Sequence, residues 1–281
     1  MKLFCLVCIT MVGFAANSIL TRVGVYAYGM DPLSFAVIRV GAGALVLGLL
    51  VFVQGQSPFA NIKARWKGAL ALATYMIGFS AAYLSLDAGM GALILFGLLQ
   101  IMMFGWAISQ RQTVTFMRWV GAGLALIGLV VLLWPSEVDV VSLAGILAMI
   151  AATAGWAVYT TLGQTLCDPL RASAGNFILC LPLVAVSLVF AKSGLPLGGI
   201  VAALVAGAVT SGLAYALWYR VLPRLPTTIA AIAQLSVPVL AVGGGVVFLA
   251  EPLTLRLWVS GLFVLGGIAV ASLRIGSAYH R

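Results

Sequence analysis

The chain has 281 residues, of which 63% are apolar and only 7% carry a charge, and its net charge is +9. A water-soluble domain needs about a quarter of its residues charged, so this composition excludes an ordinary soluble protein. The positive charge does not indicate a nucleic-acid partner, because the basic residues stand singly in short connectors between apolar runs.

Ten apolar runs follow one another along the chain, separated by charges or turn residues. A helical span of the bilayer takes roughly 20 residues, and most of these runs are long enough. They are rich in Ala, Leu and Gly without a ten-residue alternation, which favours helices over a β-barrel. The sequence therefore predicts an all-α integral membrane protein with ten transmembrane helices. The runs cover residues 3–20, 32–53, 66–86, 88–108, 117–134, 142–162, 172–191, 197–219, 227–249 and 257–273.

The basic residues sort unevenly between the two sides that ten crossings define. With both termini on one side, Arg22, Arg39, Lys192 and Arg256 fall on the opposite side, and the other eleven of the fifteen Lys and Arg fall on the side of the termini. Lys and Arg stay preferentially in the cytoplasm. We therefore expect a multi-pass protein of the bacterial inner membrane with both termini cytoplasmic.

Short motifs recur along the chain at offsets of 136 to 138 residues. They predict two five-helix repeats, 1–137 and 138–281. Since five spans is an odd number, the second repeat is inverted, which in transporters places the substrate site near the midplane between the halves. The alternatives are chance recurrence of common residues, and removal of run 3–20 as a secretory signal. The matching pairs are Asp31-Pro32-Leu33 with Asp168-Pro169-Leu170, Phe79 and Tyr83 with Tyr215 and Tyr219, and Gly123 and Gly128 with Gly261 and Gly266.

The second repeat carries a family resemblance. Residues 230–253, with Pro238 in the middle, close on the sequence FLAEPLT at 248–254 and are followed by Trp258-x2-Gly261-x4-Gly266. This segment resembles the C-terminal signature of the EamA-like transporters of the drug/metabolite transporter superfamily. Residues 13–17 and 32–39 resemble the first two helices of that family, so the resemblance covers essentially the whole chain.

The resemblance implies a ten-helix, two-repeat fold that works by alternating access and commonly exports amino acids or other metabolites. Within the family the chain most resembles bacterial aromatic amino-acid exporters of the YddG type. One departure concerns the two halves, because Met102 and residues 110–113 of the first stand where the second has Pro238 and Glu251. A gating role therefore does not transfer symmetrically to both repeats.

The sequence lacks the residues that ATP hydrolysis, triad catalysis and metal binding require. The sequence has no G-x-x-x-x-G-K phosphate loop, and its single His280 lies in the tail. Cys5 and Cys8 lie inside an apolar run, where thiols are usually inert packing residues. We expect no cofactor, no metal and no enzymatic activity. The alternative of a membrane enzyme or scaffold needs clustered acids or histidines at a membrane face, and the sequence shows none.

Charged groups near the membrane are few. The first helix contains no acid, which argues against a proton-coupled antiporter for cationic drugs. Asp87 and Glu251 lie at predicted membrane boundaries, as solvated caps or as links to a neighbouring Arg. Arg39 is the deepest charge, seven residues past Pro32 and so roughly 10 Å along a helix that begins there. It either holds a substrate carboxylate through a bidentate contact or locks helices together at the outer rim.

Neutral polar and aromatic residues lie well inside the apolar runs. An unpaired amide in hydrocarbon costs several kcal/mol, so we expect these side chains to face the bundle interior or a wet cavity. Such groups suit a zwitterionic solute with an apolar side chain, although aromatic stripes at helical spacing also serve plain helix packing. The candidate substrate-binding residues are Asn17, Arg39, Tyr75, Phe79, Tyr83, Phe96, Gln100, Trp156, Tyr159, Asn176, Tyr215 and Gln234.

Pro and Gly residues within spans are candidate hinges, because Pro frees backbone groups and permits bending. We select Pro182, Pro238 and Gly243. The sequence thus predicts an alternating-access transporter that exports small metabolites, most of all amino acids including aromatic ones, and that works as a monomer in the bilayer. A carrier of sugar or nucleotide conjugates is the alternative. It would need two or more deep basic residues, and only Arg39 qualifies.

Overall fold

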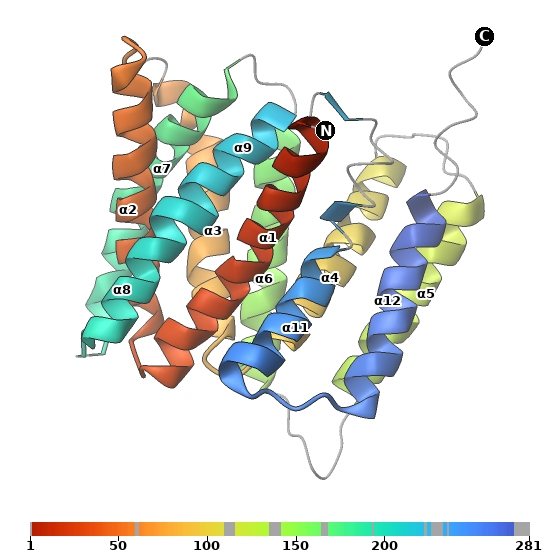
Figure 1. Ribbon diagram of the computed structural model, residues 1–281. Helices are drawn as coiled ribbons and strands as arrows, with labels where there is room; N and C mark the ends of the chain where they lie inside the picture. Colours follow the sequence, from red (N-terminus) through yellow and green to blue (C-terminus); the bar gives the residue numbers. More distant parts are fainter. Residues whose placement is uncertain are drawn as a thin grey trace, which may run out of the picture.

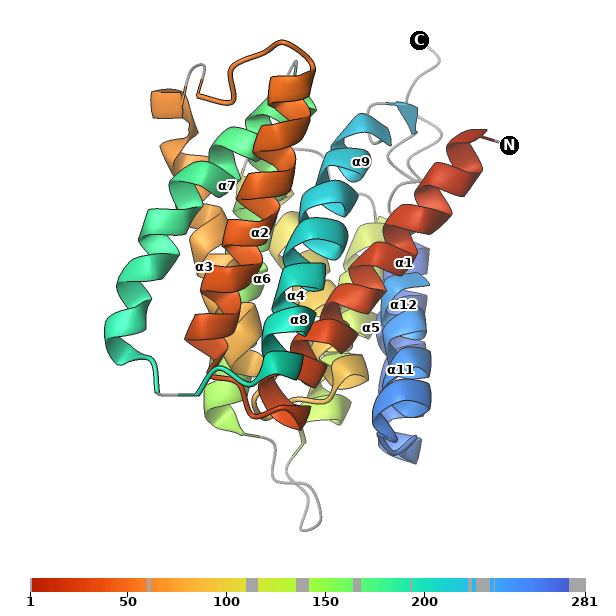
Figure 2. The same ribbon diagram turned by 60° about the vertical axis from the view of Figure 1, so that its left-hand side comes forward.

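The computed structural model describes residues 2–59, 62–109, 116–134, 142–163, 168–192, 194–221, 224–225, 233–234 and 236–272. Within these ranges all regular structure is helical (Figures 1 and 2). The helices are α1 (Lys2–Arg22), η1 (Val23–Ala27), α2 (Pro32–Val53), η2 (Ile62–Arg65), α3 (Trp66–Ala82), α4 (Ala88–Ser109), α5 (Phe116–Leu133), α6 (Leu143–Gly163), α7 (Pro169–Ala185), η3 (Val186–Phe190), α8 (Leu197–Val205), η4 (Ala206–Leu213), α9 (Ala214–Val221), α11 (Ser236–Leu249) and α12 (Leu255–Ser272).

Several of these segments join into longer rods. In the described part of the chain, α1 with η1, α7 with η3, and α8 with η4 and α9 are each continuous and, like α2, α5 and α6, long and apolar enough to cross a bilayer. With α3, α4, α11 and α12, the described part of the chain forms ten rods. Large apolar side chains are exposed around the bundle, as expected for a surface that faces lipid. The predicted all-α membrane fold with ten helices is confirmed, and the chain is a multi-pass membrane protein.

The recurring Asp-Pro-Leu motif begins corresponding helices in the two halves. The Oδ1 atom of Asp31 accepts hydrogen bonds from the backbone N–H groups of Leu33 and Ser34, at 3.0 and 2.9 Å. Asp168 caps α7 in the same way through the N–H of Arg171, at 3.1 Å. Proline follows each cap at the first helical position, where its missing N–H breaks no bond. The motif is therefore a helix start that both repeats use.

The helix contacts have an approximate two-fold pattern. Three contacts join a helix of the first half to its counterpart in the second half, namely α2 with α7, α4 with α11 and α5 with α12. The contact of α3 with α6 corresponds to that of α1 with the α8–η4–α9 rod, and the contact of α4 with α6 corresponds to that of α11 with α1. Figure 1 shows the α2–α7 and α5–α12 pairs at opposite edges of the bundle. The remaining helices lie between these two edges.

The two halves enter the bundle from opposite ends. Gly145, at the start of α6, lies against Ser85 and Leu86 in the turn after α3. Arg22, at the end of α1, donates to the Tyr83 carbonyl in the same region, at 3.0 Å. The start of α6 therefore lies where α1 ends, as an inverted repeat requires. The expected boundary between repeats at residues 137 and 138 lies outside the described residues.

Helices α5 and α12 approach each other closely at paired glycines. A Cβ atom added at Gly121 would fall against the Gly267 carbonyl oxygen and 2.6 Å from the Ala271 Cβ, whereas at Gly123 it would meet nothing within 4 Å. Close backbone approach at small residues is a common way of packing helices in membranes.

We expect Gly121→Val to lower the thermal midpoint of unfolding of the purified protein, because overpacking costs about 1–3 kcal/mol. The measurement is the loss of the monodisperse peak in size-exclusion chromatography after heating. Gly123→Val adds the same side chain two residues away and should leave the midpoint unchanged. Equal midpoints for the two variants would contradict the close crossing.

Candidate functional site

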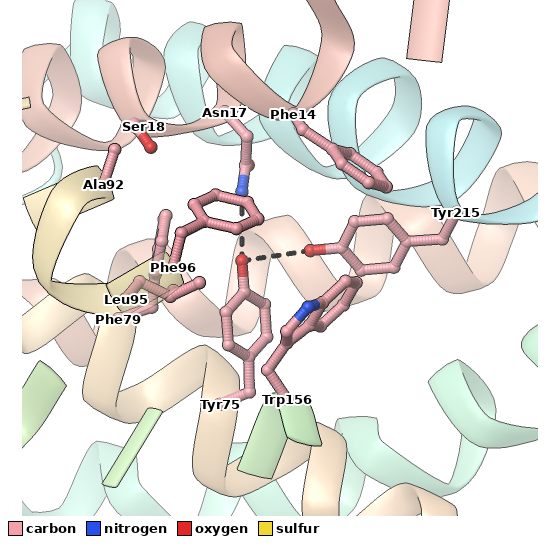
Figure 3. Close-up of a pocket in the computed structure, with 10 residues that line it drawn as sticks. All are labelled: Phe14, Asn17, Ser18, Tyr75, Phe79, Ala92, Leu95, Phe96, Trp156 and Tyr215. Carbon is pink, nitrogen blue, oxygen red and sulfur yellow. Dashed lines mark hydrogen bonds between the residues drawn. The ribbon is translucent and has the colours of Figure 1, made fainter. Parts of the chain in front are cut away.

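A pocket opens in the middle of the bundle between the two halves (Figure 3). It contains about 350 Å³ of space between side chains, part of it continuous with the exterior. Helices α1, α3 and α4 line it from the first half, and α6 and α9 from the second. The lining residues are Phe14, Asn17, Ser18, Tyr75, Phe79, Ala92, Leu95, Phe96, Trp156 and Tyr215.

Aromatic rings from four helices form one wall of the pocket. The Trp156 ring lies 5.0 Å from that of Tyr75 and 4.9 Å from that of Tyr215, between ring centroids. Phe14 meets the Trp156 ring edge-on at 6.0 Å, and Phe79 lies 5.0 Å from Tyr75. These separations are those of favourable aromatic pairs. The wall is therefore apolar and holds its rings in fixed relative positions.

Two phenols and an amide meet at the centre of the pocket. The Tyr75 hydroxyl accepts from the Asn17 Nδ2 at 3.3 Å and from the Tyr215 hydroxyl at 3.1 Å. The Asn17 Oδ1 accepts from the hydroxyls of Thr210 and Ser211, at 3.1 and 3.4 Å. These partners turn the amide nitrogen of Asn17 toward the phenols, as Figure 3 shows.

Arg39 lies behind the two phenols and is fully buried. Its Nε donates to the Ser211 Oγ at 2.8 Å, and its Nη2 donates to the hydroxyls of Tyr75 and Tyr215 at 3.4 and 3.2 Å. Its Nη1 has no hydrogen-bond partner among the described residues. The guanidinium carbon lies 5.5 Å from the Tyr75 ring centroid and 5.1 Å from that of Phe79. Arg39 thus joins α2, α3 and the α8–η4–α9 rod inside the bundle, and not at its rim.

A π-helical segment places the hydroxyl groups of this network. Thr210 and Ser211 lie within η4, where the rod between α8 and α9 widens from α-helical to π-helical geometry. Such insertions occur often at functional sites, because they turn side chains that a regular helix would point elsewhere. Sequence reasoning missed Thr210, Ser211, Phe14 and Ser18. The repeat offset of 136 pairs Ser211 with Tyr75 and was a usable signal for Ser211.

The pocket brings together only part of the predicted set. Asn17, Tyr75, Phe79, Phe96, Trp156 and Tyr215 line it. Tyr159 packs behind Trp156 with ring centroids 5.8 Å apart, and a Cβ at Gly68 would fall against buried Asn176. The Tyr83 hydroxyl donates to the Ala88 carbonyl at 3.4 Å. Gln100 and Gln234 are partly buried and are not among the ten lining residues.

Comparison with known proteins matches the sequence of this chain to a family. The model of the EamA-like transporter family matches residues 143–273. An uncharacterized protein of Pseudomonas aeruginosa is 40% identical over 273 residues, which cover 96% of this chain and 94% of that protein. The chain belongs to the EamA-like transporter family. Its members are membrane transporters, which is the function class that the sequence predicted.

Two more distant matches cover most of the chain. An uncharacterized transporter of Archaeoglobus fulgidus is 24% identical over 246 residues, covering 84% of this chain and 87% of that protein. A solved structure, described only as the crystal structure of a protein, has a TM-score of 0.68 at 21% identity and covers 94% of this chain and 97% of its own. The second match shows the shared fold alone.

The predicted hinges lie in three different settings. Pro182 lies inside α7, which tightens into the 3₁₀ segment η3 a few residues later. Pro238 lies in the first turn of α11 as described and is buried, and a Cβ at Gly243 would meet nothing within 4 Å. The hinge roles of all three residues stay predictions.

The Glu-Pro motif of the EamA-like signature belongs to an ionic cluster at the end of the bundle where α1 finishes. Arg22 pairs with Asp87 at 2.8 Å and with Glu251 at 3.5 Å, and Glu251 also accepts from the Ala88 N–H at 2.9 Å. Ala250 has a φ of 53°, in the left-handed region, which turns the chain so that Glu251 reaches α4. Of the two alternatives for Asp87 and Glu251, the link to a neighbouring Arg is confirmed.

The acidity of Glu251 gives this Arg22 cluster a pH dependence. Burial raises the pKa of the Glu251 carboxyl, and nearby Asp87 raises it too, whereas the Ala88 N–H and Arg22 lower it. A carboxyl whose pKa is higher in the folded protein than in the unfolded chain contributes stability at low pH. That stability is lost as the pH rises through the folded pKa.

We therefore expect Glu251→Gln to become more stable relative to the unmodified protein as the pH rises from about 4 to about 8. The measurement is the thermal midpoint of both proteins at each pH, and the difference between them isolates the titration of Glu251. A difference that shrinks with rising pH would show instead that the ion pair with Arg22 outweighs burial.

Proposed function

We propose that this EamA-like transporter exports amino acids and related small metabolites, aromatic ones included, through the pocket between its two repeats. The supporting observation is the lining itself, in which the faces of Phe14, Phe79 and Trp156 surround the amide of Asn17 and the phenol of Tyr75. Aromatic faces suit an apolar side chain, and the central polar groups suit its charged end. The substrate would bind with the two repeats on either side of it.

Contacts at both ends of the pocket support an alternating-access mechanism. Toward the end of α1, the Arg22 cluster ties α1 to α4 and to the turn after α11. Toward the other end, the Tyr219 ring stacks on that of Tyr159 at 5.7 Å, and its hydroxyl donates to the Tyr159 carbonyl at 3.2 Å. The Arg22 cluster joins helices from both repeats, and the Tyr159–Tyr219 contact joins α6 and α9 of the second repeat. In the proposed cycle one set opens while the other stays closed, as helix groups rock about the site.

The proposal includes an orientation in the membrane. The excess of Lys and Arg in the connectors on the side of both termini supports a cytoplasmic location for that side in a bacterial inner membrane. The Arg22 cluster would then face outward and the Tyr159–Tyr219 contact would face the cytoplasm. We also propose that one chain is the working unit, because the pocket is complete within a single chain.

The substrate class is tested by counterflow in liposomes that contain the purified protein. Labelled amino acids, nucleosides and sugars are each offered to vesicles preloaded with the same compound. We expect aromatic and large apolar amino acids to accumulate transiently. Exchange of sugars or nucleosides with no amino acid exchanged would refute the proposed substrate class.

Removal of Trp156 tests the site. Trp156 contacts the rings of Phe14, Tyr75, Tyr159 and Tyr215. We expect Trp156→Ala to slow exchange of an aromatic amino acid about threefold to tenfold, because a favourable aromatic contact contributes about 0.5–1.5 kcal/mol.

The control is Trp258→Ala, which removes an indole that is 58% exposed on α12. We expect the control to exchange substrate at the unmodified rate. Initial rates of both variants are compared at equal amounts of reconstituted, monodisperse protein. An unchanged rate in Trp156→Ala would remove this residue from the substrate path.

A further inference from the structure

The polar network of the pocket contains more hydrogen-bond donors than acceptors. The Tyr75 oxygen accepts from Asn17, Arg39 and Tyr215, and the Tyr215 oxygen accepts from Arg39. Whichever phenol donates to the other, one phenolic hydrogen remains. The Nη1 group of Arg39 also lacks an acceptor among the described residues. The Oδ1 of Asn17 and the Oγ of Ser211 already accept hydrogen bonds, and the Thr210 hydroxyl donates to that Oδ1.

The positive charge of Arg39 has no counter-ion in the described part of the chain. Each of the four described carboxylates is engaged elsewhere. Asp31 caps α2 and accepts from the Lys192 N–H, and Asp168 pairs with Arg171. Asp87 and Glu251 both pair with Arg22. A buried guanidinium in a membrane protein normally pairs with an anion or faces an ion pathway. This network therefore presents an uncompensated charge at the pocket.

We propose that the central pocket is a carboxylate site, whose ligand is a monocarboxylate with an aromatic or bulky apolar tail and needs no ammonium group. The inference rests on the proposed function and narrows it. The carboxylate oxygens accept from the free phenolic hydrogen and from Asn17, while Arg39 behind the phenols supplies the opposite charge. Charge-assisted hydrogen bonds of this kind are about twice as strong as neutral ones. The apolar tail packs on Trp156 and Phe79.

The lining of the pocket explains why an ammonium group on the ligand would add little to its binding affinity. No described lining residue is acidic, and Ser18 supplies the only side-chain oxygen in that lining outside the Asn17–Tyr75–Tyr215 network. The rings of Tyr75 and Phe79, which might hold a cation, already lie near the Arg39 guanidinium. A monoanion neutralises Arg39, whereas a zwitterion leaves the net charge of the site unchanged.

The ligand class is tested on the unmodified full-length chain in lipid nanodiscs by isothermal titration calorimetry. The probes are 3-phenylpropionate, phenylalanine, phenylalaninamide and 2-phenylethylamine, which share a phenyl ring and differ in their charged groups. We expect 3-phenylpropionate to bind at least as tightly as phenylalanine, and about tenfold or more tighter than either amine without a carboxylate. Equal or tighter binding of 2-phenylethylamine would overturn the proposal.

Two variants locate the effect at the network. Tyr75→Phe removes one hydroxyl, and Arg39→Gln removes the charge. We expect each to weaken binding of 3-phenylpropionate about tenfold and to leave that of 2-phenylethylamine unchanged. The control is Tyr28→Phe, which removes a phenol that is exposed at the end of η1. If Arg39→Gln does not fold, binding of the four probes to the unmodified chain and to Tyr75→Phe tests the carboxylate site. Unchanged preference for 3-phenylpropionate in Tyr75→Phe and in any folded Arg39→Gln would overturn the proposal.

These measurements separate the carboxylate site from the proposed function. Exchange of phenylalanine in liposomes, together with equal binding of phenylalanine and phenylalaninamide, would leave amino-acid export standing and overturn the carboxylate site. Tyr75-dependent binding of 3-phenylpropionate without exchange of any amino acid would support the carboxylate site and overturn amino-acid export. A purely structural role for Arg39 predicts a lower thermal midpoint in Arg39→Gln and no preference among the four probes.

Discussion

A guanidinium fully buried in a membrane-embedded bundle is the constraint around which the centre of this protein is organised. Because hydrocarbon offers no acceptors, the neighbouring helices must supply oxygens to Arg39. Tyr75 from α3, Ser211 from η4 and Tyr215 from α9 do so. Tyr75 and Ser211, together with Thr210, also fix the orientation of Asn17. The hydrogen bonds that hold these helices together are thus the same ones that form the polar centre of the pocket, so helix packing also sets the geometry of the site.

The two halves have similar helix contacts but differ at the positions that form the polar network of the pocket. At the repeat offsets of 136 and 137, Arg39 corresponds to Asn176, Tyr75 to Ser211 and Phe79 to Tyr215. The pattern of helix contacts is similar in both halves, whereas the charge is present in the first alone. Ser211 and Tyr215 of the second half bind that charge. The helix framework is therefore similar in the two halves, whereas the polarity of the pocket comes from positions at which they differ.

The sequence predicted the spans well and the membership of the pocket only partly. Length, hydropathy and the Asp-Pro-Leu starts locate helices, because those signals are local. Most helices here are apolar around their whole circumference, so the sequence does not tell which face turns inward. Gln100 and Tyr83 were therefore grouped with Tyr75, although neither is among the lining residues of the pocket and the Tyr83 hydroxyl donates to the Ala88 carbonyl. The π-helical geometry of η4, which directs Thr210 and Ser211, has no sequence signal that we recognise.

Two buried arginines show what the absence of an acid at the pocket means. At Arg22 the chain places two carboxylates, Asp87 and Glu251, where helix ends meet. At Arg39 it places phenols and a hydroxyl, which are neutral and weaker partners. A permanent carboxylate at Arg39 would satisfy the charge and close the site to any other anion. Neutral partners hold the guanidinium in place and leave its charge available, which is the arrangement that a site for a transient anionic ligand requires.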